Sequence, residues 1–168
     1  LTRLIKALDA KQPVTITYVR ADGTTTVRTI ELYDVIVSAA GDILLRKAST
    51  GQNVVWFGGS GDNALVLGSI GDEWLLAGVG DFNGDQQSDL LWRNPGTGEN
   101  VAWLSGNVET PLAVTRVGVA WQVAGVGDFD GDGADDLLWR HSATGQNVAW
   151  YGADSREASN IRAAAIDW

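Results

Sequence analysis

Short apolar runs separated by polar, turn-forming residues dominate this sequence. LLAGVGDF (75–82) is an apolar run punctuated by glycine, which predicts a buried strand, and a polar loop follows over 81–89. Further strands are expected downstream at 90–93, at 100–104 and around 112–121. The β-branched, aromatic and glycine residues in these runs argue against helices. The pattern therefore predicts a mainly β protein built from units of four short strands.

This four-strand unit recurs along the chain. Tryptophans are spaced 47 residues apart in three series: Trp56, Trp103 and Trp150; Trp74, Trp121 and Trp168; and Trp92 and Trp139. The stretch AGVGDFNGDQQSDLLWR is repeated as AGVGDFDGDGADDLLWR, and an earlier partial copy, ILLRKASTGQNVVWFG, spans 43–58. Four strands in one 47-residue period predict β-propeller-type blades. We therefore divide residues 43–168 into a partial blade at 43–74 and full blades at 75–121 and 122–168.

Residues 1–42 form a separate N-terminal segment that departs from this plan. Leucine and isoleucine at positions i, i+3, i+4 and i+7 of LTRLIKAL predict a short helix over 1–8. Strands are expected over 14–19 and 24–32, joined by an Asp-Gly turn into a hairpin. With a further strand over 34–46, these elements resemble the start of a WYL domain, a small SH3-like β-barrel, although the Trp-Tyr-Leu tripeptide is absent. The alternatives are a divergent blade or a helix–hairpin cap.

Two acidic loops carry the candidate chemistry. The loop DFDGDGADD (128–136) offers side-chain oxygens at its positions 1, 3, 5 and 9 and a main-chain carbonyl at position 7. Odd spacing turns alternate residues toward one centre, where a hard cation taking about six to eight oxygen ligands is satisfied, and this favours calcium. The predicted ligands are Asp128, Asp130, Asp132, Asp136 and the Ala134 carbonyl here, and Asp81, Asn83, Asp85, Asp89 and the Gln87 carbonyl one period earlier.

The same loops admit two other interpretations. An EF-hand needs Glu at its twelfth position, but Trp92 and Trp139 stand there, so we exclude it. Asp, Asn and Gly are also simple turn formers, and this alternative stays open. The Asp128 loop has four carboxylates and Gly133 at its bend, whereas Gln86 must make the same bend in the Asp81 loop. We therefore expect the Asp128 loop to bind calcium more tightly.

The repeated stretch AGVGDFDGDGADDLLWR, with TGQNVAW downstream, resembles FG-GAP/VCBS repeats. Such repeats form seven-bladed propellers in integrin heads, some lectins and many secreted bacterial proteins. The resemblance spans residues 43–168 and implies calcium bound by the two ligand sets, an extracellular or cell-surface location and a non-enzymatic role. The earliest copy has Ile36 and Ser38 in place of Asn83 and Asp85, so no ion is expected there.

Composition narrows the function classes further. A net charge of −9 disfavours a nucleic-acid binder, and no apolar run approaches the roughly 18 residues of a membrane span. The chain has no Cys and a single histidine, His141, which excludes thiolate and multi-histidine metal sites. His141 lies in a predicted turn, and the sequence contains no nucleophile elbow or phosphate-binding glycine loop, so we assign no catalytic residue.

Two other residue types recur in phase with the repeat. The tryptophans fit either the core between blades, which we favour, or stacking against the apolar face of a sugar. The arginines Arg46, Arg93 and Arg140 fit either the capping of strand ends or pairing with the acidic loops.

Two function classes follow. The first is a non-enzymatic, calcium-binding propeller module for adhesion or for recognition of glycans or extracellular proteins. The second is a purely structural or engineered chimeric scaffold, with a barrel-like N-terminus joined to propeller blades, that assembles without a specific ligand. Because 168 residues are about 3.6 periods of 47 and open blade faces are apolar, we expect a homodimer or a higher ring. The alternative is a monomer in which the N-terminal hairpin and helix cover the exposed face.

Overall fold

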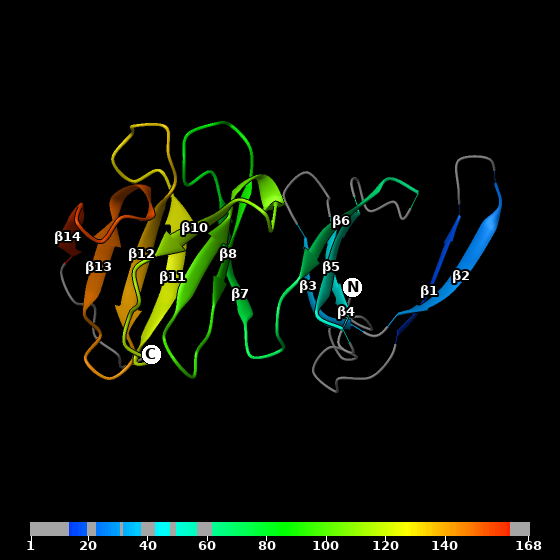
Figure 1. Ribbon diagram of the computed structural model, residues 1–168, viewed down its shortest axis with the longest axis horizontal. Coiled ribbons are helices and arrows are strands. Elements are labelled where there is room, and N and C mark those ends of the chain that lie inside the picture. The colour runs from blue at the N-terminus through cyan, green and yellow to red at the C-terminus, as the bar shows by residue number, and fades with distance from the viewer. Residues whose placement is uncertain are drawn as a thin grey trace. The chain divides into compact units, whose positions relative to one another are not determined.

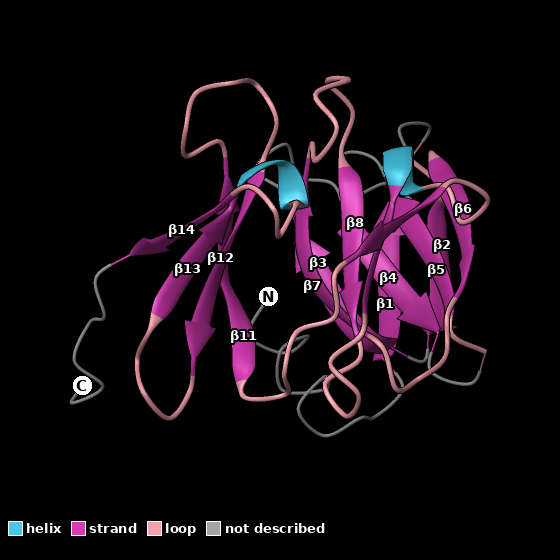
Figure 2. Ribbon diagram, turned by 60° about the vertical axis from the view of Figure 1, so that its left-hand side comes forward, coloured by secondary structure: helices cyan, strands magenta, loops and turns pink. Residues whose placement is uncertain are grey.

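The computed structural model describes residues 14–19, 23–30, 32–37, 43–47, 50–56 and 62–161, which are almost entirely β-strands and turns (Figures 1 and 2). The chain divides into two compact units, residues 1–72 and 73–168. The helix expected over residues 1–8 lies outside the described residues. Within the described part of the chain, no helix combines the length and the apolar character that crossing a membrane requires.

The first described element of the first unit is the expected hairpin. Strands β1 (Val14–Val19) and β2 (Thr25–Ile30) pair antiparallel, with Val14 opposite Ile30 and Val19 opposite Thr25. Gly23, in the connection between them, has a φ of +82°, a conformation that glycine adopts at no steric cost. The described strands of this unit form this hairpin and one four-stranded sheet, and they do not close into a barrel.

The four-stranded sheet of the first unit follows chain order. It contains β3 (Leu32–Val37), β4 (Ile43–Lys47), β5 (Gln52–Trp56) and β6 (Ala64–Ser69), with antiparallel neighbours. The single strand expected over 34–46 is therefore wrong, because β3 and β4 are two strands that pair with each other. Apolar content alone predicted one continuous strand, whereas the pairing of Ile36 with Leu44 shows two. The boundary expected between residues 42 and 43 falls inside this sheet.

The second unit holds two sheets of the same plan. The first contains β7 (Leu75–Gly80), β8 (Asp89–Arg93), β9 (Asn100–Trp103) and β10 (Pro111–Val114). The second contains β11 (Trp121–Gly127), β12 (Asp136–His141), β13 (Asn147–Trp150) and β14 (Ala158–Ile161). In both sheets sequential strands pair antiparallel, and a short 3₁₀ turn follows the third strand, at Leu104–Gly106 and Tyr151–Ala153.

The core of the second unit lies between these two sheets. Leu91 and Ala102 of the first sheet belong to one buried cluster with Leu137 and Trp139 of the second. Phe82, in the loop after β7, and Ala153, in the second 3₁₀ turn, complete this group. Leu91 and Leu137 are completely buried, and Trp139 is 1% exposed. The apolar residues that recur with the repeat thus serve to pack one sheet on the next.

A buried arginine, Arg93, binds the linker between the two sheets, which spans residues 115–120. The Arg93 guanidinium donates to the carbonyl oxygens of Val117 (3.4 Å), Gly118 (3.1 Å) and Trp121 (2.9 Å). It also donates to Asn100 Oδ1 at 2.9 Å and lies over the Trp139 ring, 5.2 Å from its centroid. Burial lowers the pKa of Arg93.

This arrangement corrects the expected end of the fourth strand and bears on the two roles considered for the arginines. The fourth strand, expected around 112–121, ends at Val114, because residues 117–121 turn their carbonyls to Arg93. The arginine therefore binds the linker rather than an acidic loop. Arg46, one period earlier, donates in the same way to the carbonyls of Ile70 and Gly71 in the first unit.

We predict that Arg93→Ala destabilises the protein by about 3 kcal/mol, because it removes a buried guanidinium that donates hydrogen bonds to three carbonyl oxygens of the linker and β11. Arg93→Lys should recover little, since one ammonium group cannot reach acceptors that a planar guanidinium spans. Arg116→Ala is the matched control, because Arg116 is exposed and its Nε donates to the Thr97 carbonyl at 2.7 Å on the surface. Urea denaturation measures the three variants, and equal stability of Arg93→Ala and Arg116→Ala would contradict this account.

Candidate functional site

The two acidic loops lie at the same end of the second unit, where Figure 1 shows them as the green and yellow connections after β7 and β11. Each loop is closed by the carboxylate at its ninth position, which is fully buried. Asp136 accepts hydrogen bonds from the N–H of Phe129 (2.7 Å) and of Gly152 (2.9 Å). Asp89 accepts from Phe82 (2.9 Å) and from Ser105 (2.7 Å) in the same way. The start of each loop and the 3₁₀ turn after the third strand are thus tied to one carboxylate.

The Asp128 loop brings three of its predicted ligands together. Carboxylate oxygens of Asp128, Asp130 and Asp136 all lie within 4.8 Å of one another. Asp128 and Asp130 are exposed, so an ion has access from solvent, while Asp136 forms the buried floor of the group. Asp132 is outside this group, and its Oδ1 accepts the N–H of Ala134 at 2.8 Å.

The carboxylates of this loop also shape its backbone. Asp128 accepts the N–H groups of Gly131 (2.6 Å) and Gly133 (3.1 Å), and Asp130 accepts that of Asp132 at 3.1 Å. These are the bonds that the turn-former interpretation requires. A carboxylate has about four lone-pair sites, so a bond to an N–H group leaves capacity for a cation. The turn-forming and ligand roles are therefore compatible.

The Asp81 loop has the same outline and a different arrangement of oxygens. Asp81 accepts the N–H groups of Asp85 (3.0 Å) and Gln86 (2.6 Å). Asn83 donates its side-chain amide to Asp85 Oδ2 at 3.1 Å, and Asp85 Oδ1 accepts the N–H of Gln87 at 2.8 Å. Among the described residues, the carboxylates of this loop form no group as close as that of the Asp128 loop.

Charge and backbone conformation distinguish the Asp81 loop further. Burial raises the pKa of Asp89, the hydrogen bonds from Ser105 and Phe82 oppose this, and the negative charges of Asp85 and Asp81 add to the rise. As expected from the sequence, Gln86 makes the bend of this loop with a φ of +66°, where Gly133 has +93° in the other loop. A left-handed conformation costs an L-residue roughly 1–2 kcal/mol, so the Asp81 loop carries a strain that the Asp128 loop avoids.

A contact that sequence reasoning missed joins the two loops. Asp135 Oδ2 accepts the N–H of Asp81 at 2.8 Å, and the Asp135 N–H donates to the Asp81 carbonyl at 2.6 Å. The sequence carries one signal of this contact. The eighth loop position holds the neutral Ser88 in one copy and the acidic Asp135 in the next.

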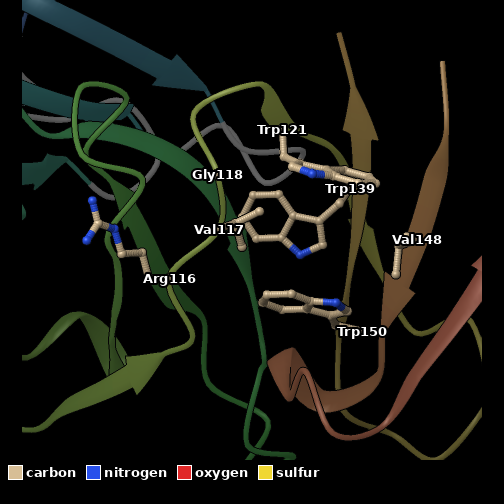
Figure 3. Close-up of a pocket in the computed structure, with 7 residues that line it drawn as sticks. All are labelled: Arg116, Val117, Gly118, Trp121, Trp139, Val148 and Trp150. Atoms are coloured by element: carbon tan, nitrogen blue, oxygen red, sulfur yellow. The ribbon is translucent and has the colours of Figure 1, made fainter. Parts of the chain in front are cut away.

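A separate pocket of about 300 Å³ lies beside the linker between the two sheets. Its walls are Trp121, Trp139, Trp150, Val148, Val117, Gly118 and Arg116 (Figure 3). Trp139 and Trp150 pack with ring centroids 5.2 Å apart and planes inclined by 56°, and Figure 3 shows the nitrogen-bearing edge of Trp139 facing Trp150. The Trp139 Nε1 is buried and has no hydrogen-bond partner.

The tryptophans differ in burial. Trp92, Trp103 and Trp139 are at most 3% exposed and belong to the interior, and Trp139 also lines the pocket, whereas the other two tryptophans of the pocket, Trp121 and Trp150, are half-buried. His141 packs edge-on against Trp121 at 5.0 Å, and its Nδ1 accepts the N–H groups of Ala143 and Thr144, both at 3.3 Å. These bonds make His141 a turn-stabilising residue.

One comparison with known proteins found a match, and the matched residues include both acidic loops. Residues 81–139 match the family described as FG-GAP-like repeat, and this stretch begins at Asp81 and includes the whole Asp128 loop. The chain therefore contains an FG-GAP-like repeat. The resemblance of residues 1–46 to a WYL domain finds no support in these comparisons. No curated protein and no solved structure matches the chain.

Proposed function

We propose that this chain is a non-enzymatic, calcium-binding β-propeller-type repeat module for adhesion or recognition outside the cell. The observation that carries the proposal is the group of three carboxylates, Asp128, Asp130 and Asp136, inside an FG-GAP-like repeat. The four-stranded antiparallel sheets that follow one another in chain order support the propeller-type architecture.

The donor set of the Asp128 loop fits a hard divalent cation. All its donors are oxygens, which suit calcium better than zinc or copper. Asp128, Asp130 and Asp136 would hold the ion, and its charge would offset the repulsion between three carboxylates within 4.8 Å of one another. The resemblance to repeats of secreted proteins and the exposure of the loop support an extracellular setting. Extracellular modules bind calcium with dissociation constants of about 10⁻⁴ to 10⁻³ M.

The tryptophan-lined pocket supports the recognition part of the proposal. Its volume of about 300 Å³ is in the range of small-ligand sites. Indole faces present flat apolar surface and an N–H donor, which suit the C–H face and the hydroxyl groups of a pyranose. We therefore assign a glycan as the ligand of this pocket.

The exposed surface of the last sheet supports self-assembly. Phe82 is 3% exposed between the two sheets of the second unit, whereas Phe129, its counterpart one period later, is 51% exposed. Phe129 lies against β11, close to Gly125 and Gly127. A large aromatic side chain that is buried in one copy and half-exposed in the next indicates a face that another sheet covers. We propose that a second copy of this chain provides that sheet.

Calcium should bind this chain and raise its melting temperature, and EDTA should reverse the effect. At a hundredfold excess over the dissociation constant, binding to the native state adds about 2.7 kcal/mol of stability. Asp130→Ala should remove more of this stabilisation than Asp85→Ala, because Asp130 belongs to the close carboxylate group. Glu109→Ala, at an exposed acid outside both loops, is the charge-matched control. Calorimetric titration without calcium-dependent heat, or the reverse order of the two loop variants, contradicts the metal assignment.

Glycan binding should depend on the half-buried tryptophans of the pocket. We expect Trp150→Ala to weaken binding of the best glycan on an array at least tenfold, a loss of about 1.4 kcal/mol. Val119→Ala, at a surface residue that is 59% exposed, should leave binding unchanged. No glycan signal from the folded wild-type chain would favour the purely structural scaffold instead.

The isolated chain should assemble in solution. Light scattering at micromolar concentration should give at least twice the chain mass of 17.8 kDa, and Phe129→Asp should reduce it to that of one chain. A mass near 18 kDa for the wild type would rule out assembly.

A further inference from the structure

The linker of residues 115–120 is bound by three residues of the preceding sheet, which we call its linker seat: Arg93, Gly98 and Asn100. Asn100 donates its side-chain amide to the Thr115 carbonyl at 2.8 Å, and the Gly98 carbonyl accepts the N–H of Val117 at 2.9 Å. These bonds, like those of Arg93 to the carbonyls of the linker and β11, are made to main-chain atoms. The seat therefore recognises the course of a main chain rather than particular side chains.

Gly98 lies at the closest point between the seat and the linker. A Cβ atom added there would lie 2.0 Å from the Val117 carbonyl oxygen, which is closer than such atoms approach in proteins. The φ of Gly98 is +80°, a conformation that glycine adopts at no steric cost. Glycine at this position thus allows the linker to lie directly on the turn.

The same seat occurs one period earlier, within the first unit, where its residues are Arg46, Gly51 and Asn53. Ile70 takes the place of Val117: its carbonyl accepts from Arg46 at 3.0 Å, and its N–H donates to the Gly51 carbonyl at 3.2 Å. A Cβ atom at Gly51 would lie 2.0 Å from the Ile70 carbonyl oxygen. The two linkers begin with different residues, Gly-Ser-Ile-Gly and Thr-Arg-Val-Gly, yet their main chains are bound in the same way.

The last sheet carries a third set of these residues, Arg140, Gly145 and Asn147, at the same spacing of 47. The Arg140 guanidinium donates to Asn147 Oδ1 at 3.3 Å, which reproduces the bond between Arg93 and Asn100. Gly145 has a φ of +68°, between the values of its two counterparts. The last sheet therefore has every element of a linker seat.

Residues 162–168, which lie outside the described residues, follow β14 in the sequence as residues 115–121 follow β10. Ala165 stands in place of Gly118, where an added Cβ atom would meet only Trp121 Cδ1 at 3.8 Å, an ordinary contact. The other side-chain differences matter little to a seat that binds main-chain atoms. Direct attachment to β14 also gives this segment a high effective concentration at the seat.

We propose that the seat of Arg140, Gly145 and Asn147 binds residues 162–168 of the same chain through their main chain. In this arrangement Arg140 donates to the carbonyls at positions 164, 165 and 168, and the N–H of residue 164 donates to the Gly145 carbonyl. Because Val117 of the first linker belongs to the core between two sheets, the bound segment would form part of any surface that packs on the last sheet. The proposal is independent of calcium and of glycan binding.

Hydrogen–deuterium exchange of the full chain, measured by mass spectrometry, tests this seat. Residues 162–168 should be protected in the wild type, because amide protection reports the free energy of local opening. In Arg140→Ala we expect their exchange to become about tenfold faster or more. Residues 115–120 are the internal reference: Arg93 binds them, so they should keep their wild-type rate in this variant.

Two glycine variants separate the close approach from the strain of a positive φ. Gly145→Ala places a Cβ atom where the carbonyl of residue 164 would lie, so it should also remove the protection of residues 162–168. Gly152 has a similar φ of +54°, but a Cβ atom there meets nothing within 4 Å, so Gly152→Ala should keep this protection. Arg156→Ala, at an exposed arginine that pairs with Asp154, is the matched control for Arg140→Ala.

Each result supports or contradicts the proposal. Residues 162–168 that exchange in the wild type as fast as an unstructured peptide would overturn it. Protection that survives in both Arg140→Ala and Gly145→Ala would overturn the role of the seat. If Arg140→Ala also loses the protection of β12 and β13, the variant has unfolded, and the two glycine variants decide: equal loss of protection in both would contradict the close approach at Gly145.

Discussion

A buried carboxylate at the end of each acidic loop is the constraint on which the second unit depends. A carboxyl group removed from water is costly unless hydrogen-bond donors meet it, and Asp89 and Asp136 are completely buried. Each solves this by accepting one N–H from the loop start and one from the turn after the third strand. In each sheet these two bonds join the start of the loop and the 3₁₀ turn to the first residue of the second strand. In the Asp128 loop, two exposed carboxylates lie close to the buried one.

The local features of this architecture can be read from the sequence. Alternation of apolar runs and turn residues located the strands that begin the repeat, and β9 begins at Asn100 as expected. Glycine chemistry predicted that Gln86 would take a positive φ. The three residues of the carboxylate group are among the predicted ligands, because odd spacing in a short loop is a local property of the chain.

The features that the sequence did not reveal arise from contacts between distant residues. The fourth strand ends early because Arg93 binds carbonyls 24 to 28 residues away. Asp135 stands beside a predicted ligand, but its partner Asp81 lies 54 residues earlier, on another loop. Asp132 fits the spacing rule for a ligand but lies outside the close carboxylate group, and its Oδ1 accepts the N–H of Ala134. Spacing along the chain does not determine any of these three arrangements.

The repeat also separates two kinds of chemistry within one unit. The acidic residues lie in the loops that follow β7 and β11, while the tryptophans that line the pocket come from β11, β12 and β13. The most direct test of the metal assignment is anomalous scattering from crystals of this chain grown with calcium. The account predicts a calcium peak about 2.3–2.6 Å from oxygens of Asp128, Asp130 and Asp136. Well-ordered loop density with no peak between these three carboxylates would contradict it.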